Sequence, residues 1–566
     1  MDFIKAKIID EIKKIMGLSE VTLEIPPNTE MGDFAFPCFS LSKLLKKSPA
    51  DIAKDLASKF NIEFVSVKAL GPYVNFFIDK SIIANSIINE IQATKLCYGC
   101  KKAVKDIVLV ESPGPNTNKP LHLGHLRNIL LGQSISKILK GQGKTVYNVN
   151  VVNDRGVHIC KSMLAYKNFS DGKTPESESR KSDHFVGDMY VLYSKAVKDN
   201  PQLENEVQEM LVKWENGDEE ILDLWKKMNN WALEGFKETY DKLGFTIDKE
   251  YFESDTYKYG KEIIEDGLKK GLFEKDDNGN IIYRLKDKNM GTKVLLRSNG
   301  TSVYITQDIY MAKLRYDDYK FDEMIYVVGN EQDYHFKVLF EVFEKLDWKF
   351  SGRCYHFSYG MVELPEGKMK SREGNVVDTD NLIDEVIELA REEVKKRYDN
   401  LDFDEIENRA NAIAMSAIRF FFLKFDPVKN FVFNPKESLA FEGETGPYVQ
   451  YAYARICSIF NKLEDYVKLQ EADLSLLDTD SDRKLLLVLS NYPKILEESA
   501  KNLKPSSLCH YLFELASTFN EYYRDISVLK AETKELRNAR LALLDSVRYV
   551  IQSGLGYLSI DVLEQM

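Results

Sequence analysis

The chain has 566 residues and a formal net charge of −12 at pH 7, with 44% hydrophobic and 29% charged residues. This length indicates about three domains rather than one core, and the composition, without any membrane-length apolar run, is that of a soluble globular protein. The acidic balance argues against nonspecific nucleic-acid binding through the overall electric field, and seven scattered cysteines are typical of a reducing cytoplasm.

The first hundred residues predict a small α/β domain. Residues 1–15 have the pattern of an amphipathic helix rather than of a signal peptide, and a second helical stretch covers residues 41–60. At the end of this region Cys97 and Cys100 have the spacing of half a zinc knuckle. No second pair lies close by, so we interpret them as two thiols that bind no metal.

A strand, a loop, a helix and a second strand follow one another in the next segment. The apolar runs 107–110 and 145–152 predict buried parallel strands, and a helical pattern begins at His122-Leu-Gly-His125 after a loop rich in proline and glycine. The helix therefore starts at the carboxyl end of a parallel strand, where orphan N–H groups and the helix dipole bind phosphate. Gly124 lacks a side chain, so a nucleotide can lie close to the backbone there.

Considered alone, the two histidines allow more than one interpretation. A His-x-x-His pair is often incidental. Such a pair also occurs in metal sites, but this sequence lacks the glutamate spacing of zinc-binding helices and has no third ligand nearby. The strand–loop–helix context favours a nucleotide site. Asp154 follows the second strand on the same ligand-binding side, either as a site residue or as a turn-forming aspartate.

A second basic motif lies far along the chain. Lys368, Lys370 and Arg372 stand between two glycines, and a flexible cationic loop suits a polyphosphate whose charge moves during reaction. The alternative is a solvated surface loop. The motif follows a strand-like run at 355–362 and precedes a predicted helix at 381–395, so it forms a second strand-to-helix corner that is suited to face the first.

The remaining patterns divide the chain into domains. Between the two motifs, residues 165–295 predict a helical insertion rich in Lys, Glu and Asp, and from about residue 386 onward the apolar spacing is helical to the end. We therefore expect three domains, at residues 1–100, 105–385 and 386–566.

At its two motifs the sequence resembles the class I aminoacyl-tRNA synthetases. The segment from His122 to His125 is similar to their HIGH signature, and the segment from Lys368 to Ser371 is similar to their KMSK signature. Further segments resemble the arginyl-tRNA synthetases in particular, namely residues 116–127, 185–188, 304–308, 446–451 and 563–566. The resemblance covers essentially the whole chain.

This resemblance implies an α/β fold. It implies a Rossmann-like parallel-sheet catalytic domain with an insertion, a small N-terminal α/β domain that contacts the tRNA elbow, and an all-α C-terminal bundle that binds the anticodon. The implied reaction is ligation of L-arginine to its tRNA through an arginyl-adenylate, with ATP and Mg²⁺ and no membrane partner. A monomer in the cytoplasm is the family expectation. Neither step needs an enzyme nucleophile, so the residues position reactants and stabilise charge.

The resemblance also assigns residues to the nucleotide site. Those expected to act on the ATP phosphates are His122, His125, Lys368, Lys370 and Arg372, and those expected to bind ATP are Lys119, Leu123, Gly124, Met369 and Ser371. The second signature departs from KMSK, because Ser371 stands in the fourth position and Lys370 in the third. Which cation meets pyrophosphate is therefore open, and Lys119 either supplies part of that charge or is a solvent-facing lysine.

Two carboxylates indicate the charge of the amino-acid substrate. If Glu111 and Asp308 face one site, they would hold a cation, and the planar fork of a guanidinium suits two carboxylates best. Asp308 alone could instead be a helix N-cap. By resemblance, the arginine site also contains Asn116, His122, Tyr304 and Gln332.

Four residues are expected to contact tRNA. Asn75 is assigned by resemblance to the D-loop contact, and Tyr448, Tyr522 and Tyr523 are assigned to base stacking in the helical domain. Each has a structural alternative, because Asn75 could satisfy backbone groups at a turn or strand edge and aromatic residues at helical spacing often fill a core. Tyr522 and Tyr523 are adjacent on a helix, so they point in different directions and one is expected to be exposed.

Overall fold

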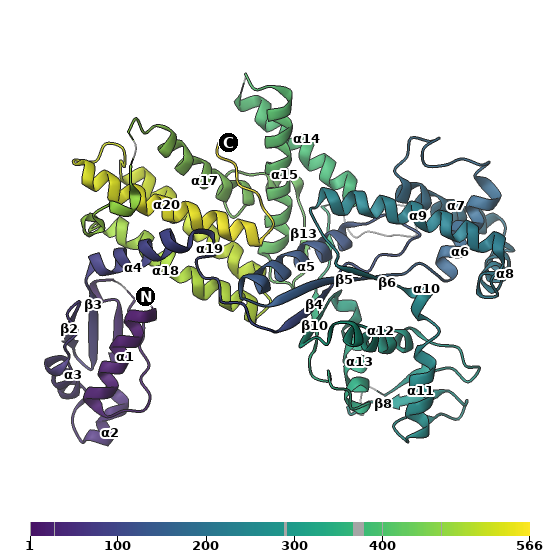
Figure 1. The fold of residues 1–566 in the computed structure, drawn as a ribbon, viewed down its shortest axis with the longest axis horizontal. Helices are drawn as coiled ribbons and strands as arrows, with labels where there is room; N and C mark the ends of the chain where they lie inside the picture. The colour runs from purple at the N-terminus through teal and green to yellow at the C-terminus, as the bar shows by residue number, and fades with distance from the viewer. Residues whose placement is uncertain (1, 28, 288–290, 366–377, 399, 466) are drawn as a thin grey trace.

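The computed structural model describes residues 2–27, 29–287, 291–365, 378–398, 400–465 and 467–566. Figure 1 shows the N-terminal domain at the lower left with the C-terminal helices above it, and two further lobes at the right, above and below the end of the central sheet. The five residues of the second signature, Lys368, Met369, Lys370, Ser371 and Arg372, lie outside the described residues.

The N-terminal domain is the predicted small α/β unit. A three-stranded antiparallel sheet has the order β1-β3-β2 and packs against α1 and α3. Its elements are α1 (Asp2–Met16), η1 (Thr29–Met31), β1 (Phe34–Pro37), η2 (Phe39–Leu41), α2 (Ser42–Leu45), α3 (Pro49–Lys59), β2 (Val65–Leu70) and β3 (Tyr73–Ile78). The chain continues in α4 (Lys80–Thr94) and η3 (Lys95–Cys97), which pack against the C-terminal helices.

The central sheet has five parallel strands in the order β11-β10-β4-β5-β6. They are β4 (Ile107–Glu111), β5 (Thr145–Val152), β6 (Lys249–Phe252), β10 (Glu323–Gly329) and β11 (Cys354–Tyr359). Side chains of β4 alternate between two cores, because Val108 and Val110 pack with α5 (Leu123–Gly141), whereas Leu109 packs with α12 and α13. The two strands predicted at 107–110 and 145–152 are confirmed.

The chain order reverses between β4 and β10. From β4 it proceeds through α5 to β5 and then β6, and it later returns to place β10 on the other side of β4. In a doubly wound sheet, ligands bind at the carboxyl ends of the strands that flank such a reversal. The start of α5 lies at this edge.

The insertion is divided into two parts, which differs from the continuous segment expected at 165–295. The first part consists of α6 (Val157–Phe169), α7 (Ser182–Asp199), α8 (Leu203–Glu215) and α9 (Glu219–Lys242), which enclose a core of their own. β6 then returns to the central sheet. The second part consists of α10 (Glu253–Thr256), α11 (Gly260–Lys269), β7 (Glu274–Lys275), β8 (Ile281–Arg284) and β9 (Thr292–Leu296). A four-residue strand such as β6 carries too little pattern to be distinguished from its neighbours.

Two helices and a short strand complete the catalytic region. α12 (Tyr304–Tyr319) and α13 (Asp333–Lys345) cover the second face of the sheet, with η5 (Asn330–Gln332) before α13, and β12 (Val362–Glu363) follows β11. α14 (Thr379–Arg397) confirms the helix predicted at 381–395.

The C-terminal part is helical, as predicted. Its elements are α15 (Phe403–Lys424), β13 (Phe431–Val432), α16 (Pro435–Ser438), α17 (Gly446–Asn461), η7 (Leu469–Glu471), η8 (Leu474–Leu476), α18 (Asp480–Lys501), α19 (Pro505–Asp525) and α20 (Lys534–Tyr557). The exception is β13, which pairs in parallel with β12. Within the described part of the chain, none of the helices combines the length and the apolar character that crossing a membrane requires.

Candidate functional site

The start of α5 is built by its two histidines. His122 is the N-cap residue, and its Nδ1 accepts a hydrogen bond from the backbone N–H of Gly124 at 3.1 Å. The Nδ1 of His125 accepts from the backbone N–H of His122, also at 3.1 Å. This reciprocal arrangement is a capping box made by imidazoles. Because both Nδ1 atoms accept, the proton of each neutral ring is on Nε2, which remains available as a donor.

Both rings are neutral near physiological pH. They stack with centroids 3.9 Å apart and an interplanar angle of 26°. Burial, assisted by the nearby charge of Lys119, lowers the pKa of His122 to about 4. Burial, together with His122 and Lys119, lowers the pKa of His125 well below its ordinary value. The helix start therefore presents two fixed N–H donors rather than two cations.

Gly124 has a local steric role. A Cβ atom at this position would lie 3.0 Å from Cε1 and 3.1 Å from Nδ1 of His122. A larger residue would displace the ring that caps the helix. The absent side chain thus makes room for His122, in addition to the close backbone approach of a nucleotide that the sequence suggested.

A cavity of about 430 Å³ opens beside this helix start. Its volume is in the range of small-molecule sites. Lys119 lines it and is partly buried, and this burial lowers the pKa of its ammonium, so the structure favours a place in the cavity wall over that of a plain solvent-facing lysine. Three segments contribute to its lining: Asn116, Lys119 and His122 before α5, His158, Arg180, His184 and Asp188 at α6 and α7, and Asp378 and Asn381 at α14.

Asp378, the first described residue after the second signature, lies directly beside His122. The two residues form an isolated antiparallel bridge, and the backbone N–H of Thr379 donates to the carbonyl oxygen of Leu121 at 3.0 Å. Asp378 also caps α14 by accepting from the N–H groups of Asp380 and Asn381. The fold therefore brings the segment that leaves the second signature to the start of α5.

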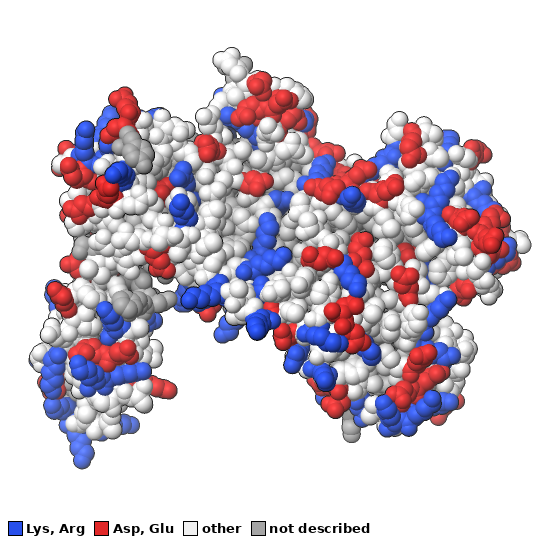
Figure 2. All heavy atoms as spheres, in the orientation of Figure 1, with Lys and Arg blue, Asp and Glu red and all other residues white. Residues whose placement is uncertain are grey.

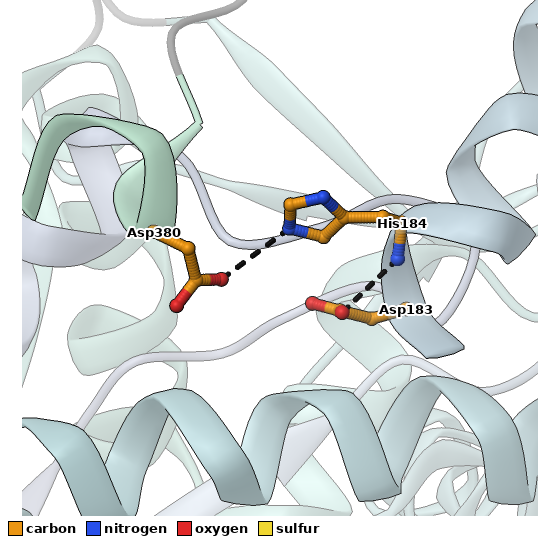
Figure 3. A group of neighbouring side chains, drawn as sticks. All are labelled: Asp183, His184 and Asp380. Carbon is orange, nitrogen blue, oxygen red and sulfur yellow. Dashed lines mark hydrogen bonds and ion pairs between the residues drawn. The ribbon is translucent and has the colours of Figure 1, made fainter. Parts of the chain in front are cut away.

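A network of charges fixes Asp378 to the insertion. Figure 3 shows Asp183 and His184 of α7 facing Asp380 of α14. His184 Nε2 lies 3.0 Å from Asp378 Oδ2 and 3.3 Å from Asp380 Oδ2. Burial alone would lower the pKa of His184, but the two carboxylates outweigh it and raise the pKa to about 9. His184 is therefore an imidazolium that joins α7 to the start of α14.

These residues also have the spacing of metal ligands, because the ligand atoms of Asp183, His184 and Asp380 lie within 4.8 Å of one another. A cation of the chain already lies among them. Lys181 Nζ lies 2.7 Å from Asp380 Oδ2 and 3.3 Å from Asp183 Oδ1. With His184 protonated and Lys181 in place, we interpret the cluster as a salt-bridge network and not as a metal centre.

Glu111 and Asp308, the two predicted substrate carboxylates, belong to one acidic cluster. Burial raises the pKa of Glu111, and the charge of Asp308 raises it further, whereas Arg315 opposes both. Glu111 forms an ion pair with Arg315 of α12, and Asp308 Oδ2 lies 2.6 Å from His335 Nε2 of α13. Asp308 is five positions into α12 and accepts no capping bond, so the N-cap alternative does not hold.

The predicted site residues fall in two places. Asn116 and His122 line the cavity, but Glu111, Asp308, Tyr304 and Gln332 do not. Tyr304, 77% exposed, begins α12 one helical turn before Asp308, and exposed Gln332 stands immediately before α13, which carries His335.

Glu253 is a residue of the acidic cluster that the sequence analysis missed. Burial raises its pKa to about 7, against the opposing charge of Arg155, and Asp154 and Asp308 are among its neighbours. Asp154 itself accepts from the N–H and the hydroxyl of Ser254 at 2.9 and 2.6 Å, which favours a structural role for it.

Arg127 of α5 is a second missed residue. Its guanidinium is fully buried and donates to the carbonyl oxygens of Gly360, Met361, Pro427 and Lys429. It thus binds α5 both to the strand region that precedes the second signature and to the segment before β13. The signal in the sequence is weak, because a polar residue on a helix predicts exposure.

Two of the predicted tRNA contacts are buried. Asn75 is 4% exposed in the middle strand β3, and Tyr522 is 2% exposed with its hydroxyl donating to Asp482 at 2.8 Å. Tyr522 presents no surface to RNA in this structure, which favours its structural alternative as a core residue. Asn75 is equally closed, but it lies in a middle strand and its Oδ1 has no hydrogen-bond partner among the described residues. The alternative that it satisfies backbone groups at a turn or strand edge therefore does not hold either, and its tRNA contact stays a prediction. The expectation that one of the adjacent tyrosines is exposed is confirmed.

Tyr523 is the exposed member, at 41%. The guanidinium of Arg455 lies 4.9 Å from its ring centroid and 4.6 Å from that of Tyr451. Tyr448 is partly buried against Phe513. Tyr451 ends the segment 446–451 that resembles the family, whereas Arg455 was not singled out from the sequence, although stacked aromatic and guanidinium groups are a common RNA-binding surface.

Charge on the visible face is mixed. Figure 2 shows Lys and Arg interspersed with Asp and Glu over every lobe. Local basic groups are therefore present on a chain whose net charge is −12. A polyanionic partner would meet them locally and not through the overall field.

Three family models match the chain in sequence. Residues 2–78 match the Arginyl tRNA synthetase N terminal domain, residues 87–435 match the catalytic domain of the class I (R) tRNA synthetases, and residues 449–566 match the DALR anticodon binding domain. The catalytic model ends beyond the boundary expected near residue 385, after β12 has paired with β13.

Relatives of the same kind match over the full length. The arginine–tRNA ligase of Treponema denticola is 46% identical over 97% of this chain and 95% of its own, and that of Parabacteroides distasonis is 41% identical over 100% and 99%. Among solved structures, the arginyl-tRNA synthetase of Thermus thermophilus superposes with a TM-score of 0.82 at 26% identity, covering both chains completely.

Proposed function

The chain belongs to the arginyl-tRNA synthetase family and ligates arginine to tRNA through an arginyl-adenylate, and we propose that the start of α5 binds the ATP phosphates in that reaction. The observation that carries this proposal is the bridge between His122 and Asp378. This bridge joins His122 of the first signature to Asp378, which is the first described residue after the second signature. A triphosphate bound at His122 would therefore lie within reach of both signatures.

In this proposal the phosphates meet neutral donors and one cation. The Nε2–H groups of His122 and His125 donate to phosphate oxygens, and Lys119 supplies positive charge from the cavity wall. The backbone at Leu123 and Gly124 adds N–H groups at the helix start. Neutral donors hold the developing charge on phosphorus without the desolvation cost that two more buried cations would impose.

The second signature supplies the remaining charge. Lys368, Lys370 and Arg372, with Met369 and Ser371, are proposed to cover the β- and γ-phosphates, and which of the two lysines meets pyrophosphate stays open. The ion pair between His184 and Asp378 supports this proposal. It holds Asp378, the first described residue after the second signature, beside the proposed phosphate site.

For arginine, we propose that Glu111 and Asp308 bind the guanidinium. Their place in one cluster supports this proposal. The charge of Asp308 makes ionisation of Glu111 less favourable, and a bound cation would relieve that repulsion. Asn116 and Gln332 would bind the α-amino and carboxylate groups or the guanidinium, and Tyr304 would close over the side chain.

Mg²⁺ is proposed to arrive with ATP. The carboxylates that line the cavity are engaged within the described part of the chain, Asp378 by His184 and Asp188 by Arg180. A magnesium ion there would keep phosphate oxygens and water as its ligands. The tRNA is proposed to contact the helical domain at Tyr448 and Tyr523. We propose a monomer by the family expectation and a cytoplasmic location, the second of which the seven free thiols support.

The test is ATP–pyrophosphate exchange with each of the twenty amino acids, with and without tRNA. We expect exchange with arginine only, and largely only when tRNA is present. Exchange with another amino acid would refute the substrate, and no exchange under any condition would indicate a tRNA-binding protein without catalytic function. Light scattering of the free enzyme tests the monomer.

A further inference from the structure

Cys97 and Cys100 are held at the two ends of one tight turn. The backbone N–H of Cys100 donates to the carbonyl oxygen of Cys97 at 2.9 Å. Tyr98 has φ −59° and ψ 125°, and Gly99 has φ 82°. These angles are those of a type II β-turn with glycine at the position that requires positive φ. Such a turn holds its end Cα atoms within about 7 Å, which is the range that a disulfide spans.

The two thiols face each other and differ in exposure. Burial raises the pKa of Cys100, its contact with Tyr557 lowers it, and the neighbouring thiol of Cys97 raises it further. Cys97 is exposed and Cys100 is partly exposed. Of the other five cysteines, Cys38, Cys160, Cys457 and Cys509 are buried and Cys354 is partly exposed. An accessible thiol beside a second, more protected thiol is the arrangement of a reversible dithiol.

The turn lies where three parts of the protein meet. Gln142, just after α5, donates from Nε2 to the carbonyl oxygen of Gly99 at 3.2 Å. A Cβ at Gly99 would lie 3.0 Å from the Cα of Pro493 in α18, so the turn is pressed against the C-terminal helices. Cys100 Sγ lies 3.3 Å from the hydroxyl of Tyr557 in α20. The chain entering the turn comes directly from the N-terminal domain through η3.

A metal site accounts less well for the pair. Two thiols supply only half of a tetrahedral zinc site. In the described residues, the one group of three or more suitable ligands is that of Asp183, His184 and Asp380, far from this turn in sequence and on different elements.

We propose that Cys97 and Cys100 form a reversible disulfide at this junction. The Cys97 thiolate attacks one sulfur of a small-molecule disulfide, forming a mixed disulfide and releasing one thiolate. The Cys100 thiolate then attacks Cys97 Sγ, which forms the intramolecular bond and releases the second thiolate. In sum the two cysteines lose two electrons and two protons, and the small disulfide is reduced to two thiols. Cys100 Sγ has no proton left to donate once the disulfide has formed, so its contact with the hydroxyl of Tyr557 then requires the tyrosine to donate.

The proposal is tested by equilibrating the full-length enzyme in buffers of reduced and oxidised glutathione. After acid quenching and alkylation, peptide mass spectrometry measures the fraction in which the two cysteines are joined and two hydrogens are lost. We expect a single two-electron transition that is reversed by dithiothreitol. Cys97→Ser and Cys100→Ser are each expected to abolish it, and Cys354→Ser, which removes the other partly exposed thiol, is expected to leave it unchanged.

Two results would overturn the proposal. One is that Cys97 accumulates only as a glutathione adduct, which would show that Cys100 does not resolve the mixed disulfide. The other is that both thiols stay reduced while Cys354 reacts. Unfolding of the Ser variants is checked by circular dichroism, and the wild-type transition decides the question without any variant.

Discussion

Glu111 and Arg315 form an ion pair that is almost closed to solvent, with side-chain exposures of 10% and 2%. Glu111 ends β4 and Arg315 lies in α12, so the pair joins the central sheet to the helix that carries Asp308. Burial alone would lower the pKa of Arg315, but Glu111 raises it above its ordinary range. Arg315 in turn opposes the rise that burial causes in the pKa of Glu111. The ionised form of a buried carboxylate that is proposed to bind a guanidinium is thus favoured by a guanidinium of the protein.

Replacing Arg315 tests this dependence. In Arg315→Met the pKa of Glu111 rises further, so we expect a higher KM for arginine near neutral pH that recovers as the pH increases. The free energy of unfolding should fall by about 3–5 kcal/mol, because one partner of a buried pair is lost. KM for arginine across pH and urea unfolding measure both effects. Arg315→Lys, which keeps the charge, is the control, and a lower KM in the Met variant would show instead that Arg315 competes with the substrate.

His184 predicts a loss of stability at alkaline pH. Its pKa is raised to about 9 by Asp378 and Asp380 despite burial, with Asp183 and Lys181 as the other charged neighbours. A raised pKa gives stability that is complete below about pH 6.5 and is lost as the pH rises through about 9. The difference in unfolding free energy between wild type and His184→Gln should therefore shrink by about 3 kcal/mol between about pH 6 and pH 9.5. A difference independent of pH would contradict the charged form of His184.

Much of the fold follows from sequence because local pattern determines it. The strand at 107–110 is a continuous apolar run, the strand at 145–152 is mostly apolar, and the helix after His122 has the spacing of a buried helix. The sequence did not predict β6 or the β12–β13 pair, because a strand of two to four residues is too short to show an alternating pattern. Recognition of β6 would also have pointed to Glu253, which follows it at the carboxyl edge of the sheet.

The partners of the site residues were not predictable. Glu111 and Arg315 are far apart in the sequence, and so are His184 and Asp378, and one sequence without homologues does not report which distant residues meet. Adjacency showed that Tyr522 and Tyr523 point in different directions, but which one is buried depends on the packing of α19 against α18. Pairing across domains is decided by tertiary packing and not by local propensity.

The exposed ring of Tyr523 predicts a contribution to tRNA affinity that is independent of ATP and arginine binding. Tyr523→Ala removes a stacking face, so we expect tRNA affinity to weaken by about 1–3 kcal/mol, with KM for ATP and arginine unchanged at saturating tRNA. Tyr522→Phe is the matched control, because it removes only the buried bond to Asp482 and should lower stability without changing KM for tRNA. Equal effects of the two variants on tRNA charging would contradict the assignment.

Arg127 is predicted to position the strand that leads to the second signature. Arg127→Met leaves two buried and two partly buried carbonyl oxygens without their donor, and we expect a loss of about 3 kcal/mol in unfolding free energy. We also expect kcat of exchange to fall while KM for arginine is kept. Arg127→Lys should not restore kcat, since an ammonium lacks the planar fork that reaches two segments at once. Full activity of the Lys variant would show that charge alone suffices.

The neutral histidines of α5 predict how the reaction depends on pH. Because burial lowers the pKa of His122 to about 4 and that of His125 well below its ordinary value, no imidazole of this pair changes charge between about pH 6 and pH 8. We therefore expect the pH profile of kcat for exchange to show no ionisation of a histidine in that range. His125→Ala is expected to reduce kcat by about 10²–10³-fold, because it removes a donor to the transition state. A lowered pKa gives stability that is present above about pH 6.5 and lost as the pH falls towards 4.

Unfolding measured against pH completes this test. Wild type should lose stability between about pH 6.5 and pH 4, and His122→Asn, which keeps a side-chain cap without a group that titrates there, should lose less. If kcat instead followed an ionisation near pH 6.5 that disappears in His125→Ala, the histidines would act as cations. The Nδ1 acceptors of the capping box would then be protonated, and the helix start seen here would not be the reactive form.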